Sequence, residues 1–145
     1  MIKEDYVSLE IAKLLKEKGF DEECSKFWLY NKNDTNEVCL VSCGLLGDTN
    51  LELNNSQIDT ILNDNKNGYS APTLQMAMKW LREVHNLCLE PYRTACGYLC
   101  DVAIVPSGSE IYGQYDEGDD ENSGEFTTYE KSCEAAIKYC LENLI

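Results

Sequence analysis

Residues 70–90 read SAPTLQMAMKWLREVHNLCLE, an amphipathic helix followed directly by a strand. Pro72 suits a first helical turn, where its missing N–H leaves no hydrogen bond unmade. The apolar stripe then recurs at helical spacing, at Leu74, Ala77, Met78, Leu81 and Val84 or His85. Asn86 is a suitable helix stop, and residues 87–90 have the composition of a strand. Such a helix buries its stripe against a sheet, so the stretch predicts stacked layers of helix and sheet.

The same pattern is found on both sides of this stretch. Residues 8–18 predict a helix with Ser8 as N-cap and Gly19 as the left-handed residue after its end, which brings Phe20 to Leu15. Residues 127–143 predict a third helix, with Thr127 and Glu130 as a capping box. Its apolar stripe consists of Cys133, Ala136, Ile137, Cys140, Leu141 and Leu144.

Strands are predicted in pairs between the helices. Residues 26–30 and 37–42 predict an antiparallel hairpin, while residues 87–90 and 98–105 predict strands that Pro91 and Pro106 limit. A short edge strand is expected at 111–115. The two remaining segments are an irregular Asn-rich connection (44–69), with a short helix at 56–62, and an acidic loop (116–125).

These elements predict an α+β fold in the order α-β-β-α-β-β-(β)-α. We expect one antiparallel sheet of four to five strands, packed with the three main helices in a single domain over 1–145.

The net negative charge of the chain limits the kinds of partner that it can bind. The chain has 26 acidic and 12 basic residues and one histidine, a net charge of −14, and residues 101–145 hold 11 acidic and 2 basic residues. This balance argues against direct binding to nucleic-acid backbones or anionic membranes, which need clustered Lys and Arg. It suits a basic protein partner or a cation. No apolar run is long enough for a membrane span and residues 1–6 lack a signal-like apolar stretch, so we expect a cytoplasmic protein.

The eight cysteines fall mostly within apolar runs. We therefore interpret them as reduced thiols that act as small hydrophobic residues, with one disulfide as the alternative. Cys39 and Cys43, like Cys96 and Cys100, have the spacing of a weak zinc site. Four residues of extended strand span about 13 Å, so each pair chelates zinc only if the chain turns between its members.

Three helical segments, residues 8–20, 70–86 and 129–141, resemble a family of short uncharacterised proteins from phages, prophages and mobile elements of gut anaerobic bacteria. The resemblance covers about half of the chain. It implies a phage or mobile-element origin, but no activity, no cofactor and no functional residue.

The acidic loop contains a partial EF-hand register. Asp119, Glu121, Ser123 and Glu130 fall at calcium-ligand positions and Gly124 at the turn position. The helix that should enter such a loop is missing from the sequence pattern. The alternative interpretation is a solvated acidic loop in which Glu130 caps the helix.

Catalysis has weaker support in the sequence. His85 is the only histidine, and a Cys–His pair is conceivable because there are eight cysteines. However, no nucleophile elbow, phosphate-binding loop or dinucleotide fingerprint is present. We therefore expect a non-catalytic phage or prophage accessory protein, with no cofactor, that binds a basic host or phage protein.

The candidate interaction residues lie in and before the acidic loop: Tyr112, Tyr115, Asp116, Glu117, Asp119 and Asp120. Two alternative functions are a cation-binding module that uses residues 119–130 and an inhibitor that covers a host factor with this acidic face.

Overall fold

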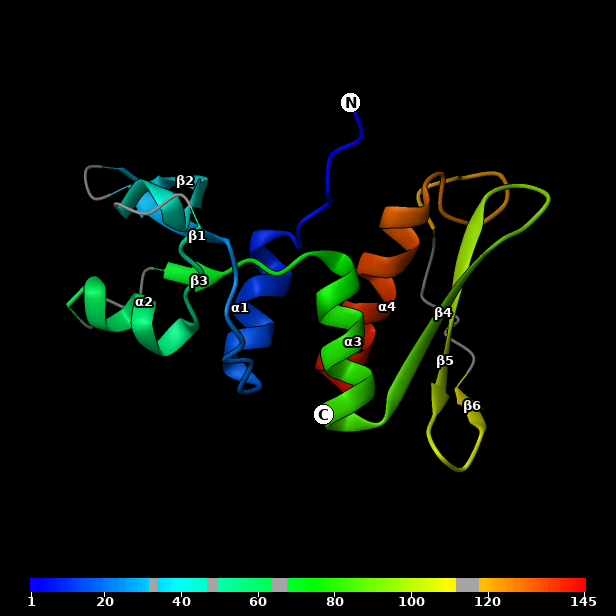
Figure 1. The fold of residues 1–145 in the computed structure, drawn as a ribbon. Coiled ribbons are helices and arrows are strands. Elements are labelled where there is room, and N and C mark those ends of the chain that lie inside the picture. Colours follow the sequence, from blue (N-terminus) through cyan, green and yellow to red (C-terminus); the bar gives the residue numbers. More distant parts are fainter. Residues whose placement is uncertain (32–33, 47–49, 64–67, 112–117) are drawn as a thin grey trace. The chain divides into compact units, whose positions relative to one another are not determined.

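The computed structural model describes residues 1–31, 34–46, 50–63, 68–111 and 118–145. The chain divides into two compact units, residues 6–73 and residues 1–5 with 74–145, and each is described by itself. Both combine helices with a small antiparallel sheet, which confirms the predicted α+β class (Figure 1). The single-domain expectation stays a prediction. Within the described residues no helix is both long and apolar enough to cross a membrane.

Residues 6–73 begin with helix α1 (Leu9–Glu17), whose two ends form as predicted. The Ser8 side chain accepts a hydrogen bond from the N–H of Ile11. At the other end Gly19 has φ of 91° and the N–H of Phe20 donates to the Leu15 carbonyl at 2.9 Å. Glycine adopts this left-handed conformation without a Cβ clash, and the chain can therefore turn sharply and bury Phe20.

The sheet of this unit has the order β2-β1-β3. Strands β1 (Lys26–Asn31) and β2 (Asp34–Ser42) form the predicted hairpin, and β2 begins earlier than expected. Strand β3 (Gly68–Ser70) was not expected, because it has only three residues in an Asn-rich segment. After β2 follow the short helix η1 (Cys43–Leu46) and helix α2 (Asn55–Ile61), which matches the short helix expected in this connection.

A buried amide joins the parts of this unit. The Asn55 side chain donates to the Phe20 carbonyl at 2.7 Å and accepts from the N–H of Ser70 at 2.8 Å. Next to it, Ile58 packs with Phe27, Leu53 and Cys43 in one apolar cluster. The amide therefore provides hydrogen-bond partners for two backbone groups, which the surrounding apolar side chains cannot do.

The second unit contains helix α3 (Leu74–His85), the predicted amphipathic helix, which ends at Asn86 with φ of 58°. It packs against strand β4 (Leu87–Arg93), which pairs with β5 (Tyr98–Ile104). Strand β6 (Ser109–Ile111) completes the order β4-β5-β6. Of the edge strand expected at 111–115, residues 112–115 lie outside the described residues.

Helix α4 (Tyr129–Asn143) contacts β4, β5 and α3. In Figure 1 it lies beside α3, coloured orange to red. Its predicted stripe is buried at Cys133, Ala136, Ile137, Cys140 and Leu141, facing a layer that contains Leu87, Leu89, Cys100 and Val102.

Three details of the sequence prediction are wrong. The strands form two sheets instead of one, since each hairpin takes its own short third strand. Pro91 lies within β4 and does not end it, because β4 pairs with β5 alone among the described residues and its outer edge needs no N–H. The N-cap of α4 is Thr128, which accepts from the N–H of Lys131, and not Thr127, which is hydrogen-bonded to Asp119.

Candidate functional site

The candidate site is the described part of the acidic loop, residues 118–127, and the first turn of α4. Two backbone hydrogen bonds between Tyr98 and Phe126, of 2.9 and 3.1 Å, attach the loop to β5. The Phe126 side chain is buried and the Tyr129 ring meets Tyr98 edge-on, with 6.3 Å between ring centroids. Backbone and aromatic contacts thus hold the acidic segment against the sheet.

A second attachment comes from the β4–β5 turn. The Thr94 hydroxyl donates to the Glu125 carboxylate and accepts from the N–H of Gly97 at 3.0 Å. Gly97 lies directly against the Phe126 carbonyl, where a Cβ would clash. A glycine is therefore required for the loop to approach the strand this closely.

Asp119 organises the end of the loop. Its carboxylate accepts from the Thr127 N–H at 2.7 Å, from the Thr127 hydroxyl at 2.6 Å and from the Lys131 ammonium. The hydrogen bond from Lys131, followed by those from Thr127, lowers the pKa of Asp119. Asp119 therefore keeps its negative charge well into the acidic range.

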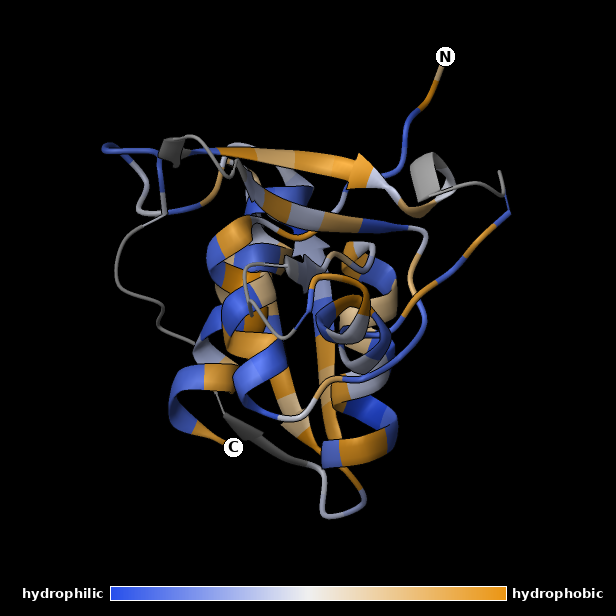
Figure 2. Cartoon of the chain, turned by 90° about the vertical axis from the view of Figure 1, so that its left-hand side faces the viewer, coloured by the Kyte–Doolittle hydropathy of each residue, from blue (hydrophilic) through white to orange (hydrophobic). Residues whose placement is uncertain are grey.

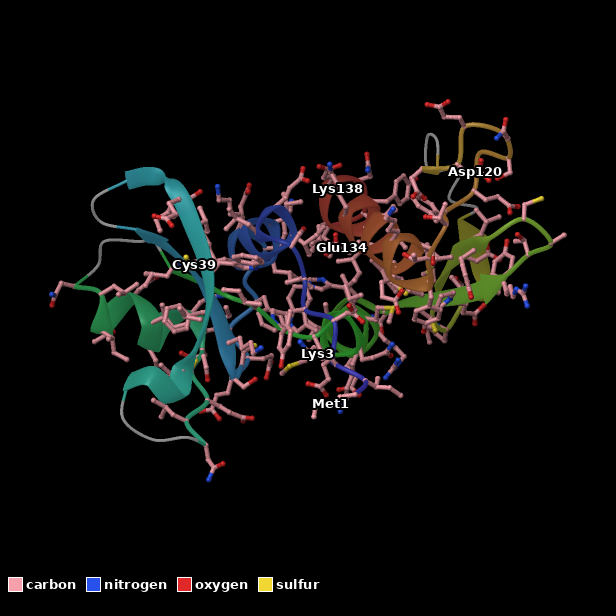
Figure 3. All side chains as sticks on the ribbon, turned by 90° about the horizontal axis from the view of Figure 1, so that it is seen from above. Met1, Lys3, Cys39, Asp120, Glu134 and Lys138 are labelled. Atoms are coloured by element: carbon pink, nitrogen blue, oxygen red, sulfur yellow. The ribbon has the colours of Figure 1, made fainter. Side chains whose placement is uncertain are left out.

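Asp120 closes the tip of the loop. It accepts from the Asn122 N–H and from the Ser123 hydroxyl, both at 2.9 Å, and these bonds, that of Asn122 first, lower the pKa of its carboxyl. Figure 3 labels Asp120 on the loop that precedes α4. The two aspartates thus hold the loop in one conformation and remain charged within it.

The predicted calcium ligands are not gathered around a common point. The Asp119 carboxylate accepts hydrogen bonds from Thr127 and Lys131. The Glu121 side chain is exposed, and the Ser123 hydroxyl donates to Asp120. Glu130 lies in the first turn of α4. In the described ranges no group of three or more His, Cys, Asp or Glu side chains is placed to hold a metal ion. Calcium binding stays a prediction.

Of the candidate interaction residues, only Asp119 and Asp120 can be placed. Tyr112, Tyr115, Asp116 and Glu117 lie outside the described residues. From the sequence Gly97 is expected only as a turn between Cys96 and Cys100, and neither its close approach to Phe126 nor the role of Thr94 is predicted. The ion pair between Asp119 and Lys131 could not be predicted, because Asp119 belongs to the acidic loop and Lys131 to helix α4.

None of the eight cysteines forms a disulfide in the structure. Cys39 and Cys96 are exposed while Cys43 and Cys100 are buried, so neither pair with zinc-like spacing has both members in the same environment. Burial raises the pKa of Cys24 to about 12, of Cys133 to about 11 and of Cys140 to about 12. These side chains are therefore poor thiolates, and they occupy space in the apolar layers.

His85, the only histidine, ends α3 against Trp80, with the ring centroids 4.5 Å apart and the planes at 70°. Burial lowers its pKa, and its Nε2 atom is buried without a hydrogen-bond partner. The lowered pKa favours the neutral imidazole, whose ring packs edge-on against Trp80.

Comparison with known proteins found no matching family model, no similar curated protein and no similar solved structure.

Proposed function

We propose that the protein is a non-catalytic binding protein whose acidic loop and adjoining turn of α4 dock a basic surface of another protein. The observation that carries the proposal is the hydrogen bonding of Asp119 and Asp120, within a loop that Phe126 attaches to β5. An acidic surface that is ordered before binding loses less conformational entropy when a partner arrives.

Charge supports the same proposal. The chain carries a net charge of −14, and 11 of its 26 acidic residues lie in residues 101–145. Because the pKa values of Asp119 and Asp120 are lowered, both charges persist at any physiological pH. Such a field attracts a Lys- and Arg-rich protein surface, accelerates the encounter and repels phosphate backbones and anionic lipids.

The resemblance of the helical segments favours a cytoplasmic accessory protein of a phage or prophage, with a basic host or phage protein as partner. A protein that covers the basic surface of a host factor would also block the contacts that this surface makes, and in that case the protein acts as an inhibitor.

The test uses an oligolysine peptide as the probe and calorimetry as the readout. The loop variant Glu121→Gln/Glu130→Gln removes two charges from the candidate site. The control Glu22→Gln/Glu23→Gln removes the same number from exposed positions of the other unit. Since both variants have the same net charge, any difference between them reports the location of binding.

We expect the loop variant to bind oligolysine more weakly than the control, and binding by the wild type to weaken as salt is raised. Equal losses in the two variants would show that the peptide responds to net charge alone, and the proposed docking site would then be wrong.

A further inference from the structure

The open edge of β2 carries the further inference. In the described part of the chain β2 pairs with β1 alone, so the sheet ends at β2. Figure 2 shows β2 as the uppermost strand of its unit, coloured as hydrophobic over much of its length. An edge strand presents every second N–H and C=O group outward, ready to pair with a further strand.

Each face of this sheet has contacts within the unit. Phe27 and Val41, which are paired across β1 and β2, pack into the cluster with Ile58. On the other side the Lys13 ammonium lies 5.1 Å from the Tyr30 ring centroid and 5.8 Å from that of Tyr69. The β2 edge is the longer of the two edges of this sheet, since β3 has only three residues.

The β2 edge has few of the features that usually prevent strands from associating. Residues 37–42 read EVCLVS and contain no Pro, Lys or Arg, and the side chains of Val38, Leu40 and Val41 are only half-buried. The corresponding edge strand of the other sheet, β4, carries Pro91 and ends at Arg93. Proline and charge at an edge discourage pairing, so Pro91 and Arg93 protect β4, whereas β2 has only Asp34 and Glu37, which precede its apolar residues 38–41.

We propose that β2 pairs antiparallel with β2 of a second copy of this chain, about a two-fold axis at Cys39. This register sets Val38 against Leu40, so that apolar residues meet, and it sets Glu37 against Val41, which keeps the two Glu37 carboxylates apart. A register centred on Glu37 would oppose like charges, which destabilises a strand pair. Self-complementarity about Cys39 is the reason for choosing a second copy as the occupant.

Cys39 provides a direct readout of this arrangement. It is exposed, and Figure 3 labels it on β2, the strand nearest the viewer in its unit. Residues directly opposite in antiparallel strands have Cβ atoms about 4.5–5.5 Å apart, so the two thiols lie within reach of a short crosslinker. Cys96, the other exposed cysteine, lies in the other unit and is the matched control.

The first experiment treats the reduced full-length protein with bismaleimidoethane. We expect a covalent dimer from wild type and Cys96→Ser, and none from Cys39→Ser. Glu37→Cys in a Cys39→Ser/Cys96→Ser background should also give none, because residue 37 faces residue 41 in this register. A covalent dimer that persists in Cys39→Ser, or forms equally well through residue 37, would overturn the proposal.

The second experiment measures association without a crosslinker, by sedimentation equilibrium under reducing conditions. We expect the wild type and Cys96→Lys to dimerise and Cys39→Lys to remain monomeric at the same concentrations, with circular dichroism to confirm that each variant is folded. Because each copy carries a charge of −14, dimerisation should strengthen with salt, opposite to the binding of a basic partner. A wild type that stays monomeric at all concentrations and salts would overturn the proposal.

Discussion

Tyr98 and Phe126 exchange two backbone hydrogen bonds, and through this bridge the acidic loop becomes a neighbour of β5. The bridge brings the start of α4 to the sheet that α4 covers. It depends on Gly97, since only a residue without a Cβ fits against the Phe126 carbonyl.

The first prediction concerns Gly97. Gly97→Ala should destabilise the protein by about 1–3 kcal/mol, because the new methyl group must displace backbone. The free energy of urea unfolding is the measurement. Ala95→Ser in the same turn, at an exposed position, should leave stability nearly unchanged. Equal stability of Gly97→Ala and wild type would show that the loop does not lie where we describe it.

The second prediction concerns the buried amide of Asn55. Asn55→Ala leaves the Phe20 carbonyl and the Ser70 N–H without partners, and a loss of at least about 2 kcal/mol is expected. Its neighbour Asn54 caps α2, so Asn54→Ala should lose only about 1 kcal/mol. The free energy of urea unfolding of the two variants distinguishes a buried hydrogen-bonded amide from a helix cap. Equal losses of free energy in the two variants would contradict the prediction.

The third prediction is a pH dependence set by Asp119. Its folded-state pKa lies below the ordinary value of 3.8, so it contributes stability that is present above that value and is lost as pH falls through the folded pKa. The stability difference between wild type and Asp119→Asn should therefore be largest near neutral pH and shrink in acid. Thermal unfolding at a series of pH values measures it.

Lys131→Gln provides the control for the cause. In this variant the pKa of Asp119, followed by the NMR signal of its carboxyl carbon, should move upward toward 3.8. An unchanged titration would show that Lys131 does not hold the carboxylate.

The fourth prediction concerns the thiols. Native alkylation with iodoacetamide, read by mass spectrometry, should modify Cys39 and Cys96 first. Cys24, Cys133 and Cys140, whose pKa values burial raises, should react only after unfolding. Rapid labelling of any of these three would point to an activated thiol and revive the hypothesis of thiol catalysis.

The sequence predicted the elements whose signals are local. Ser8, Gly19 and Phe20 fix both ends of α1 through hydrogen bonds between residues close in the chain. The stripes of α3 and α4 are periodic, and both hairpins join strands that are adjacent in sequence. For the same reason the α+β class could be recognised.

The rest depends on contacts between distant residues. Nothing local in Gly68–Ser70 shows that it pairs with β1, or that the two hairpins belong to separate sheets. Thr127 and Thr128 are equivalent as sequence. Thr127 donates its N–H and hydroxyl to Asp119, and Thr128 is therefore the residue that caps α4. The conformation of the acidic loop could not be predicted for the same reason, because the loop is held by contacts with the distant residues Lys131, Thr94 and Tyr98.

The two ends of residues 6–73 lie next to each other, which matters for engineering the chain. Tyr6 and Thr73 form a bridge, the Val7 N–H donates to the Pro72 carbonyl at 3.0 Å, and the Leu74 N–H donates to the Asp5 carbonyl at 3.0 Å. Residues 6–73 therefore begin and end at neighbouring points in the structure. Because Asp5 and Leu74 are already hydrogen-bonded to each other, a short link could rejoin the two ends that removal of residues 6–73 would create.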